Sequence, residues 1–201
     1  IEHPQKWRKC SVMTERWRLV NGAELYDIGK DPGQAGNLAS EHPEVAERLR
    51  GVYEAWWTDV SRRHDEYSRI VLGNPAENPS RLTCHDWHES APPWDQSHIS
   101  RGHIATGFWA VEVERDGEYE VELRRWPREA DRPIGDGPGL EETSARVAVG
   151  EVKASGPVEP EAKGVTFRLK LPAGPAKLRA EFLDSDGKVC GAYFVYVKRL
   201  P

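Results

Sequence analysis

The stretch RWRLVNGAELYDI at residues 16–28 decides the fold of the first third of the chain. Polar and apolar residues alternate in its first half, which is typical of a strand with one buried face. A second strand-like run, residues 24–28, follows the dipeptide Asn21-Gly22. Both turn residues tolerate the positive φ that tight hairpin turns require. We therefore predict a hairpin here, with residues 11–14 leading into its first strand.

A helix is predicted to follow over residues 43–60. Pro43 suits the first helical turn, where its missing N–H costs nothing. Acidic residues near the start complement the helix dipole. Apolar residues recur at spacings of three and four and predict one buried stripe, formed by Val45, Leu49, Val52, Trp56 and Val60.

The last hundred residues carry a different pattern, of short apolar-alternating segments separated by turns. Residues 108–124 predict a hairpin with a three-residue loop at 115–117. That loop pairs Val113 with Tyr119 and places the apolar residues on one face. It also places Glu112 opposite Glu120, which is unfavourable without nearby basic groups. Further strands are expected at 145–149, 164–171, 176–183 and 189–198.

These segments predict an α+β chain in three parts. Residues 1–72 form a small antiparallel sheet with one amphipathic helix. Residues 73–103 hold four prolines and are expected to be an irregular connector loop. Residues 104–201 form an all-β sandwich, because about six strands in about 100 residues with short turns close most readily in that way.

Composition excludes several functional classes. The 28 basic and 33 acidic side chains are mostly interspersed and leave a net charge of -5, whereas a nucleic-acid binder should show a basic excess or stripe. No apolar run approaches the roughly 20 residues of a membrane span. The 3 cysteines are far apart and form no disulfide framework.

The ordered motifs of the first part resemble the C-terminal subdomain of type I sulfatases, the arylsulfatase-like enzymes of the alkaline phosphatase superfamily. That family shows the pattern R-T-x-R-[WY]-[KR]-L, then E-L-Y-D-[LI]-x-x-D-P-x-E, then N-L-A and an amphipathic helix. The chain matches over about residues 5–60, with Met13 for the usual Arg and Gln34 for the usual Glu. The matching segments are VMTERWRLV at 12–20, ELYDI at 24–28, DPGQ at 31–34 and NLA at 37–39. Residues 78–88 and 107–109 are similar, less specifically, to C-terminal extensions of some bacterial sulfatases.

The resemblance implies sulfate-ester hydrolysis by a formylglycine made from Cys or Ser in a C-x-P-S-R segment, assisted by bound calcium. Pro79-Ser80-Arg81 matches the end of that segment, but Glu77 stands at the modified position and Cys84 follows the arginine. No acidic pairs suited to calcium are apparent. We therefore expect no cofactor and no catalytic or metal-binding residue in this chain. Formylglycine and calcium would lie upstream of Ile1, in the N-terminal catalytic domain of a periplasmic or secreted parent enzyme.

The densest group of chemically versatile residues is CHDWH at 84–88. Arg81, His85 and His88 could donate to a sulfate group, with Asp86 beside them, while Trp87 could stack on a sugar ring. Two alternatives remain open. The group could bind zinc, although no second ligand pair lies at a typical spacing. It could also be a loop anchored by its tryptophan, with histidines that satisfy backbone groups.

A second candidate contact is Arg125 with Trp126, within RRWPR at 124–128. The alternative is that Arg124 and Arg128 neutralise the glutamates of the predicted hairpin. Together these features predict the C-terminal part of a sulfatase that packs beside the cleft and helps to bind a sulfated carbohydrate, with neither nucleic acid nor membrane as a partner. A carbohydrate-binding β-sandwich module and a structural accessory domain without a ligand are the alternatives.

Overall fold

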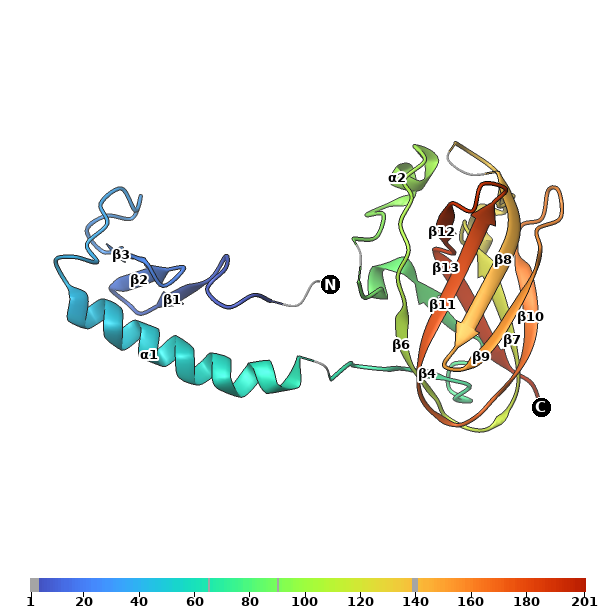
Figure 1. Ribbon diagram of the computed structural model, residues 1–201, viewed down its shortest axis with the longest axis horizontal. Coiled ribbons are helices and arrows are strands. Elements are labelled where there is room, and N and C mark those ends of the chain that lie inside the picture. The colour runs from blue at the N-terminus through green and yellow to red at the C-terminus, as the bar shows by residue number, and fades with distance from the viewer. Residues whose placement is uncertain (1–3, 65, 90, 139–140) are drawn as a thin grey trace. The chain divides into compact units, whose positions relative to one another are not determined.

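The chain has an α+β fold with a β-rich C-terminal part (Figure 1). The computed structural model describes residues 4–64, 66–89, 91–138 and 141–201. The chain has two compact units, the N-terminal unit, which ends at Tyr67, and the sandwich, which begins at Ser68. The boundary lies before the position 72 expected from the sequence, because residues 70–72 form a strand of the sandwich.

The N-terminal unit is a three-stranded antiparallel sheet with one helix packed on it. The strands are β1 (Ser11–Met13), β2 (Trp17–Val20) and β3 (Glu24–Asp27), in the order β1-β2-β3. The predicted hairpin is β2–β3, and its turn residues Asn21 and Gly22 both have positive φ. The small core of this unit consists of Trp17, Leu19, Leu25, Ala46 and Leu49.

Helix α1 spans Pro43–Val60, as the sequence predicts, and the short 3-10 helix η1 (Ser61–Arg63) follows it. The predicted stripe is wrong at two positions. The helix buries Ala46, Leu49 and Tyr53, whereas Val52 is 54% exposed and Trp56 is 53% exposed. The three short strands cover only part of the apolar helix surface, so one edge of the stripe remains uncovered.

The sandwich contains two sheets that face each other (Figure 1), and apolar residues from both sheets form its core. One has the order β10-β7-β13-β5, and the other has the order β4-β6-β11-β8-β9 with β12 paired to β11. Strand β4 pairs with β6 in parallel, and the other pairs are antiparallel. The strands are β4 (Ile70–Leu72), β5 (Ser80–Thr83), β6 (Trp109–Val113), β7 (Gly117–Arg124), β8 (Glu142–Val149), β9 (Val152–Pro157), β10 (Val165–Leu171), β11 (Gly174–Asp184), β12 (Val189–Gly191) and β13 (Phe194–Arg199).

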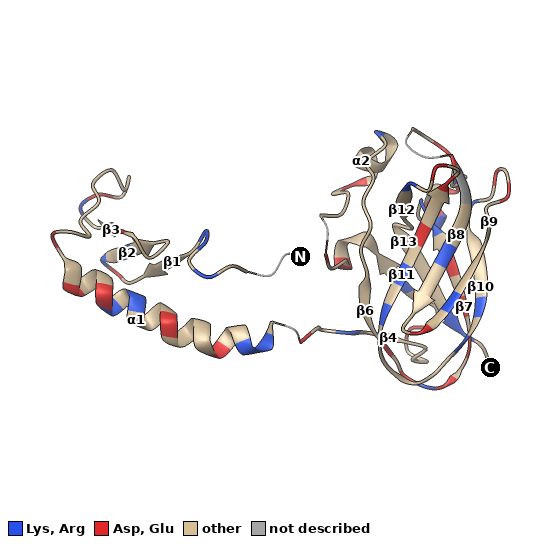
Figure 2. Ribbon diagram, viewed as in Figure 1, with Lys and Arg blue, Asp and Glu red and all other residues tan. Residues whose placement is uncertain are grey.

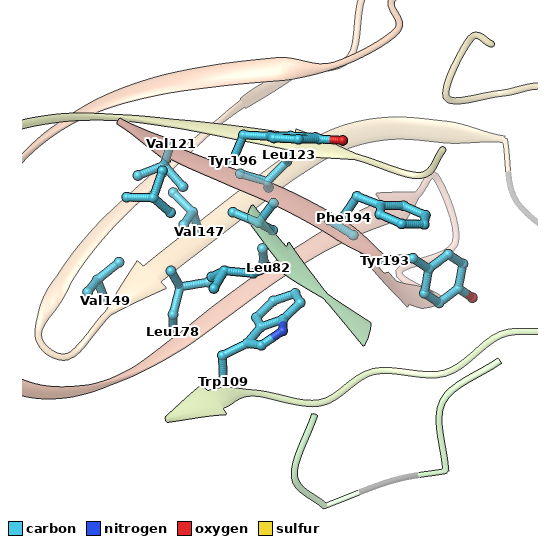
Figure 3. Packing of buried hydrophobic residues seen from close by; sticks show 14 of the residues in the cluster. Leu82, Trp109, Val121, Leu123, Val147, Val149, Leu178, Tyr193, Phe194 and Tyr196 are labelled. Carbon is cyan, nitrogen blue, oxygen red and sulfur yellow. The ribbon is translucent and has the colours of Figure 1, made fainter. Parts of the chain in front are cut away.

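The core between the sheets is filled by alternate residues of facing strands (Figure 3). Val121 and Leu123 project from one sheet, and Val147 and Leu178 project from the other, all at most 2% exposed. This alternation is what one buried face per strand requires. Figure 3 shows Trp109 among the same cluster.

The predicted hairpin over residues 108–124 is wrong. Strand β6 pairs with β4 and β11, whereas β7 pairs with β10 and β13, so the two strands belong to opposite sheets. Their buried faces are as predicted, with Val113 and Tyr119 both in the core. The buried faces of β6 and β7 lie opposite each other across the core instead of side by side in one sheet. Each of the two strands pairs with two other strands. Glu120 consequently lies between Arg168 and Lys198 and not opposite another glutamate.

Residues 73–103 are not purely a connector. They supply the edge strand β5, which pairs with β13, together with the 3-10 helix η2 (Cys84–Asp86) and helix α2 (Gln96–Ser100). A third short 3-10 helix, η3, spans Arg128–Ala130. The expected strand at 189–198 is two strands, β12 and β13, which belong to different sheets. The sequence did not predict strand β9, because residues 152–157 contain no apolar run. In the structure each residue of this strand is partly or fully exposed.

Candidate functional site

Trp87 is a core residue and not a sugar-stacking surface. Its side chain is 1% exposed, and its ring centroid lies 5.4 Å from that of Trp109 and 5.6 Å from that of Tyr193. Two glycines make room for the ring. A Cβ at Gly191 would lie 2.3 Å from the indole, and one at Gly107 would lie 2.8 Å from it. The prediction that Trp87 contacts substrate is therefore wrong.

His88 and Cys84 of the CHDWH segment are also held by the fold. The backbone of His88 bridges to Phe108, and the two rings stack with centroids 5.2 Å apart. Cys84 is buried, and burial raises the pKa of its thiol to about 12. Within the described ranges, no three His, Cys, Asp or Glu side chains are grouped so that they could hold a metal ion.

His85 and Asp86 remain exposed, and His85 helps to position an aromatic residue that sequence reasoning left unassigned. Its Nε2 lies 2.9 Å from the carbonyl oxygen of Trp94, and the backbone N–H of Trp94 donates to Nδ1 of His98 at 3.2 Å. The indole of Trp94 is 76% exposed. Two histidines thus fix the backbone of a residue whose ring faces solvent, an arrangement suited to stacking on a ligand.

Local sequence explains how the Trp94 turn is built. Pro92 and Pro93 precede it, and Asp95 caps helix α2 by accepting from the backbone N–H of His98 at 3.1 Å. The hydroxyl of Ser97 and that N–H lower the pKa of Asp95. The Pro-Pro-Trp-Asp sequence is the signal that could have identified the position.

Asp86 accepts from the Thr83 hydroxyl at 3.3 Å.

Arg81 belongs to the outer face of the four-stranded sheet. Its guanidinium pairs with Glu129 at 3.4 Å, and in the register of β5 and β13 it lies opposite Tyr196. Arg128 lies over the same tyrosine ring, 4.1 Å from its centroid. Arg81 thus belongs to a local group of charges and one aromatic ring on this sheet, and its partners do not include His85.

Arg125 and Trp126 are buried, at 1% and 0% exposure, so their prediction as substrate contacts is wrong. Arg125 donates to the carbonyl oxygens of Ile134 at 3.3 Å and Pro138 at 2.8 Å, and so ties down the following loop. The alternative interpretation of the flanking arginines agrees with the structure. Arg124 and Arg128 both pair with Glu122, at 2.9 Å and 2.8 Å.

The sulfatase-like motif residues of the N-terminal unit form its internal polar framework. Arg16 donates to the nearly buried carboxylate of Asp27 at 2.8 Å. Burial alone would raise the pKa of Asp27, but the hydrogen bond and charge of Arg16 and the N–H of Lys30 outweigh it and lower that pKa. Asn37 Oδ1 accepts from the backbone N–H groups of Leu25 and Ala39, both at 3.0 Å. In this unit these motif residues therefore stabilise the packing of strands and loops.

The N-terminal unit also has an uncovered apolar surface. Met13 is 55% exposed, and Val52 and Trp56 of α1 are similarly exposed. They surround a hollow of about 500 Å³. We call this region the apolar hollow; it is lined by Pro4, Gln5, Arg8, Lys9, Cys10, Ser11, Val12, Met13, Val52, Tyr53, Trp56 and Trp57.

The Pro79-Ser80-Arg81 segment has no accessible nucleophile. Ser80 is completely buried, and its Oγ lies 3.2 Å from the carbonyl oxygen of Val71 and 3.1 Å from that of Glu77. The hydroxyl is thus engaged with backbone groups at the edge of the sheet.

Comparisons with known proteins give little additional information. No family model and no curated protein matches the chain. Among solved structures, a ruminal GH26 endo-β-1,4-mannanase is 16% identical with a TM-score of 0.41, over 68% of this chain and 27% of that one. DesR, a β-glucosidase from Streptomyces venezuelae in complex with D-glucose, is 16% identical with a TM-score of 0.29, over 60% and 13%. No helix of the described residues is long and apolar enough to cross a membrane.

Proposed function

We propose that the chain is the C-terminal part of a formylglycine-dependent sulfatase that hydrolyses sulfate esters of a carbohydrate outside the cytoplasm. The observation that carries the proposal is the ordered motif of the N-terminal unit. The arginine–aspartate pair Arg16–Asp27 and the bridging Asn37 hold a three-stranded sheet on which α1 packs. Within the described residues no group of His, Cys, Asp or Glu side chains could hold a metal ion. The proposal assigns both the formylglycine and the calcium to the N-terminal catalytic domain of the parent.

The apolar hollow supports a partner domain for the N-terminal unit. Met13, Val52 and Trp56 are large apolar side chains, each more than half exposed, and they lie around one hollow. An exposed apolar patch of this kind is typical of a protein–protein contact. In this proposal the parent's catalytic domain covers it.

The first test is sequencing of the coding region upstream of Ile1, followed by expression of the complete reading frame. We expect a C-x-P-S-R or S-x-P-S-R segment and hydrolysis of 4-nitrophenyl sulfate. Replacement of the modified Cys or Ser by Ala should abolish the activity. A reading frame without that segment, or a complete enzyme without sulfatase activity, would refute the proposal.

A second test addresses the contact itself. Val52→Glu adds a charge to the apolar hollow. In the 201-residue chain the residue is 54% exposed, so the substitution should change the unfolding temperature little. In the complete enzyme the charge would be buried and should lower stability markedly. Thr58→Glu adds the same charge at an exposed position of α1 outside the apolar hollow and is the matched control. Equal effects of Val52→Glu in the two proteins would contradict the proposed contact.

The exposed ring of Trp94 favours carbohydrate binding by the sandwich as a second candidate function. Its backbone is held by His85 and His98 while its ring faces solvent. If the ring stacks on a sugar, saturating glycan should quench or shift tryptophan fluorescence, and Trp94→Ala should remove that response. A structural domain without a ligand would give no response with any glycan.

A further inference from the structure

The outer face of the six-stranded sheet carries a second hollow, of about 460 Å³. Its lining includes the basic residues Arg146, Lys153 and Arg179, together with Ala148, Ser155 and the carboxylate of Glu181. These basic residues come from β8, β9 and β11, which lie side by side in the sheet (Figure 2). We call this region the cationic hollow.

The strand register explains its shape. Arg179 lies opposite Ala148, which in turn lies opposite Lys153. The two cations are therefore two strands apart, about 10 Å between their backbones. The small side chain of Ala148 leaves space between Arg179 and Lys153. The two long basic side chains therefore lie on either side of an open space above Ala148.

Ion pairs hold the two arginines in place. Arg146 donates to Glu181 at 2.6 Å, and Glu181, which is 6% exposed, also accepts from the Thr106 hydroxyl at 2.8 Å. Arg179 pairs with Glu89 and lies over the ring of Phe108, 5.4 Å from its centroid.

The cationic hollow keeps a surplus of positive charge. Lys153 has no acidic partner within the described part of the chain, so three cations face two carboxylates. The outer face of the four-stranded sheet is different, because Arg168 lies opposite Glu120 and Lys170 lies opposite Glu118. The surplus is therefore a local feature of a chain whose net charge is -5.

We propose that the cationic hollow binds the sulfate groups of a sulfated polysaccharide. Guanidinium groups fit tetrahedral oxyanions through paired N–H donors, and Lys153 adds a point charge. An open sheet face can accept a polymer that extends beyond one binding group. None of the described lining residues is aromatic, so the hollow lacks the stacking platform typical of single-stranded nucleic acid sites. The choice of sulfate as the anion rests on the proposed function.

The test is titration calorimetry of the 201-residue chain with dextran sulfate and with unsulfated dextran. We expect binding of the sulfated polymer alone, weakened by added salt. The double variant Lys153→Gln/Arg179→Gln should raise Kd about tenfold or more, because it removes two of the three cations that would contact the sulfate groups. The control Arg168→Gln/Lys170→Gln removes the same charges from the opposite sheet and should leave Kd unchanged.

A second variant avoids the existing ion pairs. Ala148→Glu fills the floor of the cationic hollow with a negative charge and should weaken binding as strongly as the double variant. Unfolding curves of all variants show whether each remains folded. No binding of dextran sulfate, or equal weakening by the control, would overturn the proposal.

Equal affinity for a single-stranded oligonucleotide, lost in the same variants, would overturn the sulfated-glycan assignment. This assay needs no catalytic domain. A parent enzyme without sulfatase activity would therefore refute the proposed function and leave the binding result unaffected.

Discussion

Replacement of Trp87 by Ala should destabilise the sandwich, whereas replacement of Trp94 by Ala should not. Both tryptophans lie within residues 73–103, but Trp87 is 1% exposed and Trp94 is 76% exposed. Removal of a fully buried tryptophan costs about 3–5 kcal/mol. An exposed substitution usually changes stability by less than about 0.5 kcal/mol.

Differential scanning calorimetry of the 201-residue chain measures both effects. For a unit of this size, a loss of 3–5 kcal/mol lowers Tm by roughly 10–20 °C. Because the chain has two compact units, two transitions are expected. Trp17→Ala removes a core residue of the N-terminal unit and assigns that unit's transition.

The result that would refute the reasoning is a Trp87→Ala variant with an unchanged sandwich transition. Trp87 would then not carry the packing against Trp109 and Tyr193. A comparable fall in Tm for Trp94→Ala would also refute it, because the ring of Trp94 would have to be buried. Loss of glycan-induced fluorescence changes in Trp94→Ala alone would agree with the assignment of Trp94 to binding.

Three further predictions concern packing, thiol reactivity and pH. Gly191→Ala should lower the Tm of the sandwich, because the new methyl group would overlap the ring of Trp87, and overpacking of this kind costs about 1–3 kcal/mol. Burial raises the pKa of Cys84 to about 12, so its thiolate fraction is about a thousandfold below that of an ordinary thiol. Mass spectrometry of the native chain after brief iodoacetamide treatment should therefore show Cys10 alkylated before Cys84. The pKa of Asp27 is lowered in the fold, so the ionised carboxylate stabilises the N-terminal unit above the ordinary pKa near 4. That stabilisation is lost as pH falls through the lowered pKa. In Asp27→Asn, the Tm of the N-terminal unit should therefore fall less steeply at acidic pH.

Features set by neighbours in the sequence could be predicted. Pro43 at the start and the apolar periodicity that follows located α1 correctly. Asn21-Gly22 located the β2–β3 turn, because those residues adopt positive φ readily. The inward faces of β6 and β7 also followed from alternation alone. These properties depend on local conformation and on one buried face per strand.

Strand partners could not be predicted in the same way. The alternation in β6 and β7 fits a hairpin and equally fits two strands that face each other across a core. The choice depends on β10, β11 and β13, which follow much later in the chain and supply the actual neighbours. Register within a proposed pair is therefore informative only after the pair itself is known.

The candidate site shows the same dependence for single side chains. Tryptophan and arginine occur both in buried positions and in ligand contacts. Their presence near histidines in the sequence therefore did not show which of these two roles each residue has. Trp87 is buried because Gly191, on the distant strand β12, leaves space for its ring. Arg125 is buried because the carbonyl oxygens of a later loop accept its hydrogen bonds. Trp94 has no such cover and faces solvent.

The resemblance to sulfatases depends on residues that maintain a fold, and this determines what can be tested in the chain itself. Arg16, Asp27 and Asn37 connect strands and loops inside the N-terminal unit. A protein could retain these residues for the sake of the sheet and helix alone. The proposed sulfatase activity therefore has to be measured in the protein encoded by the complete reading frame. Anion binding by the cationic hollow depends only on the sandwich and can be measured in the 201-residue chain.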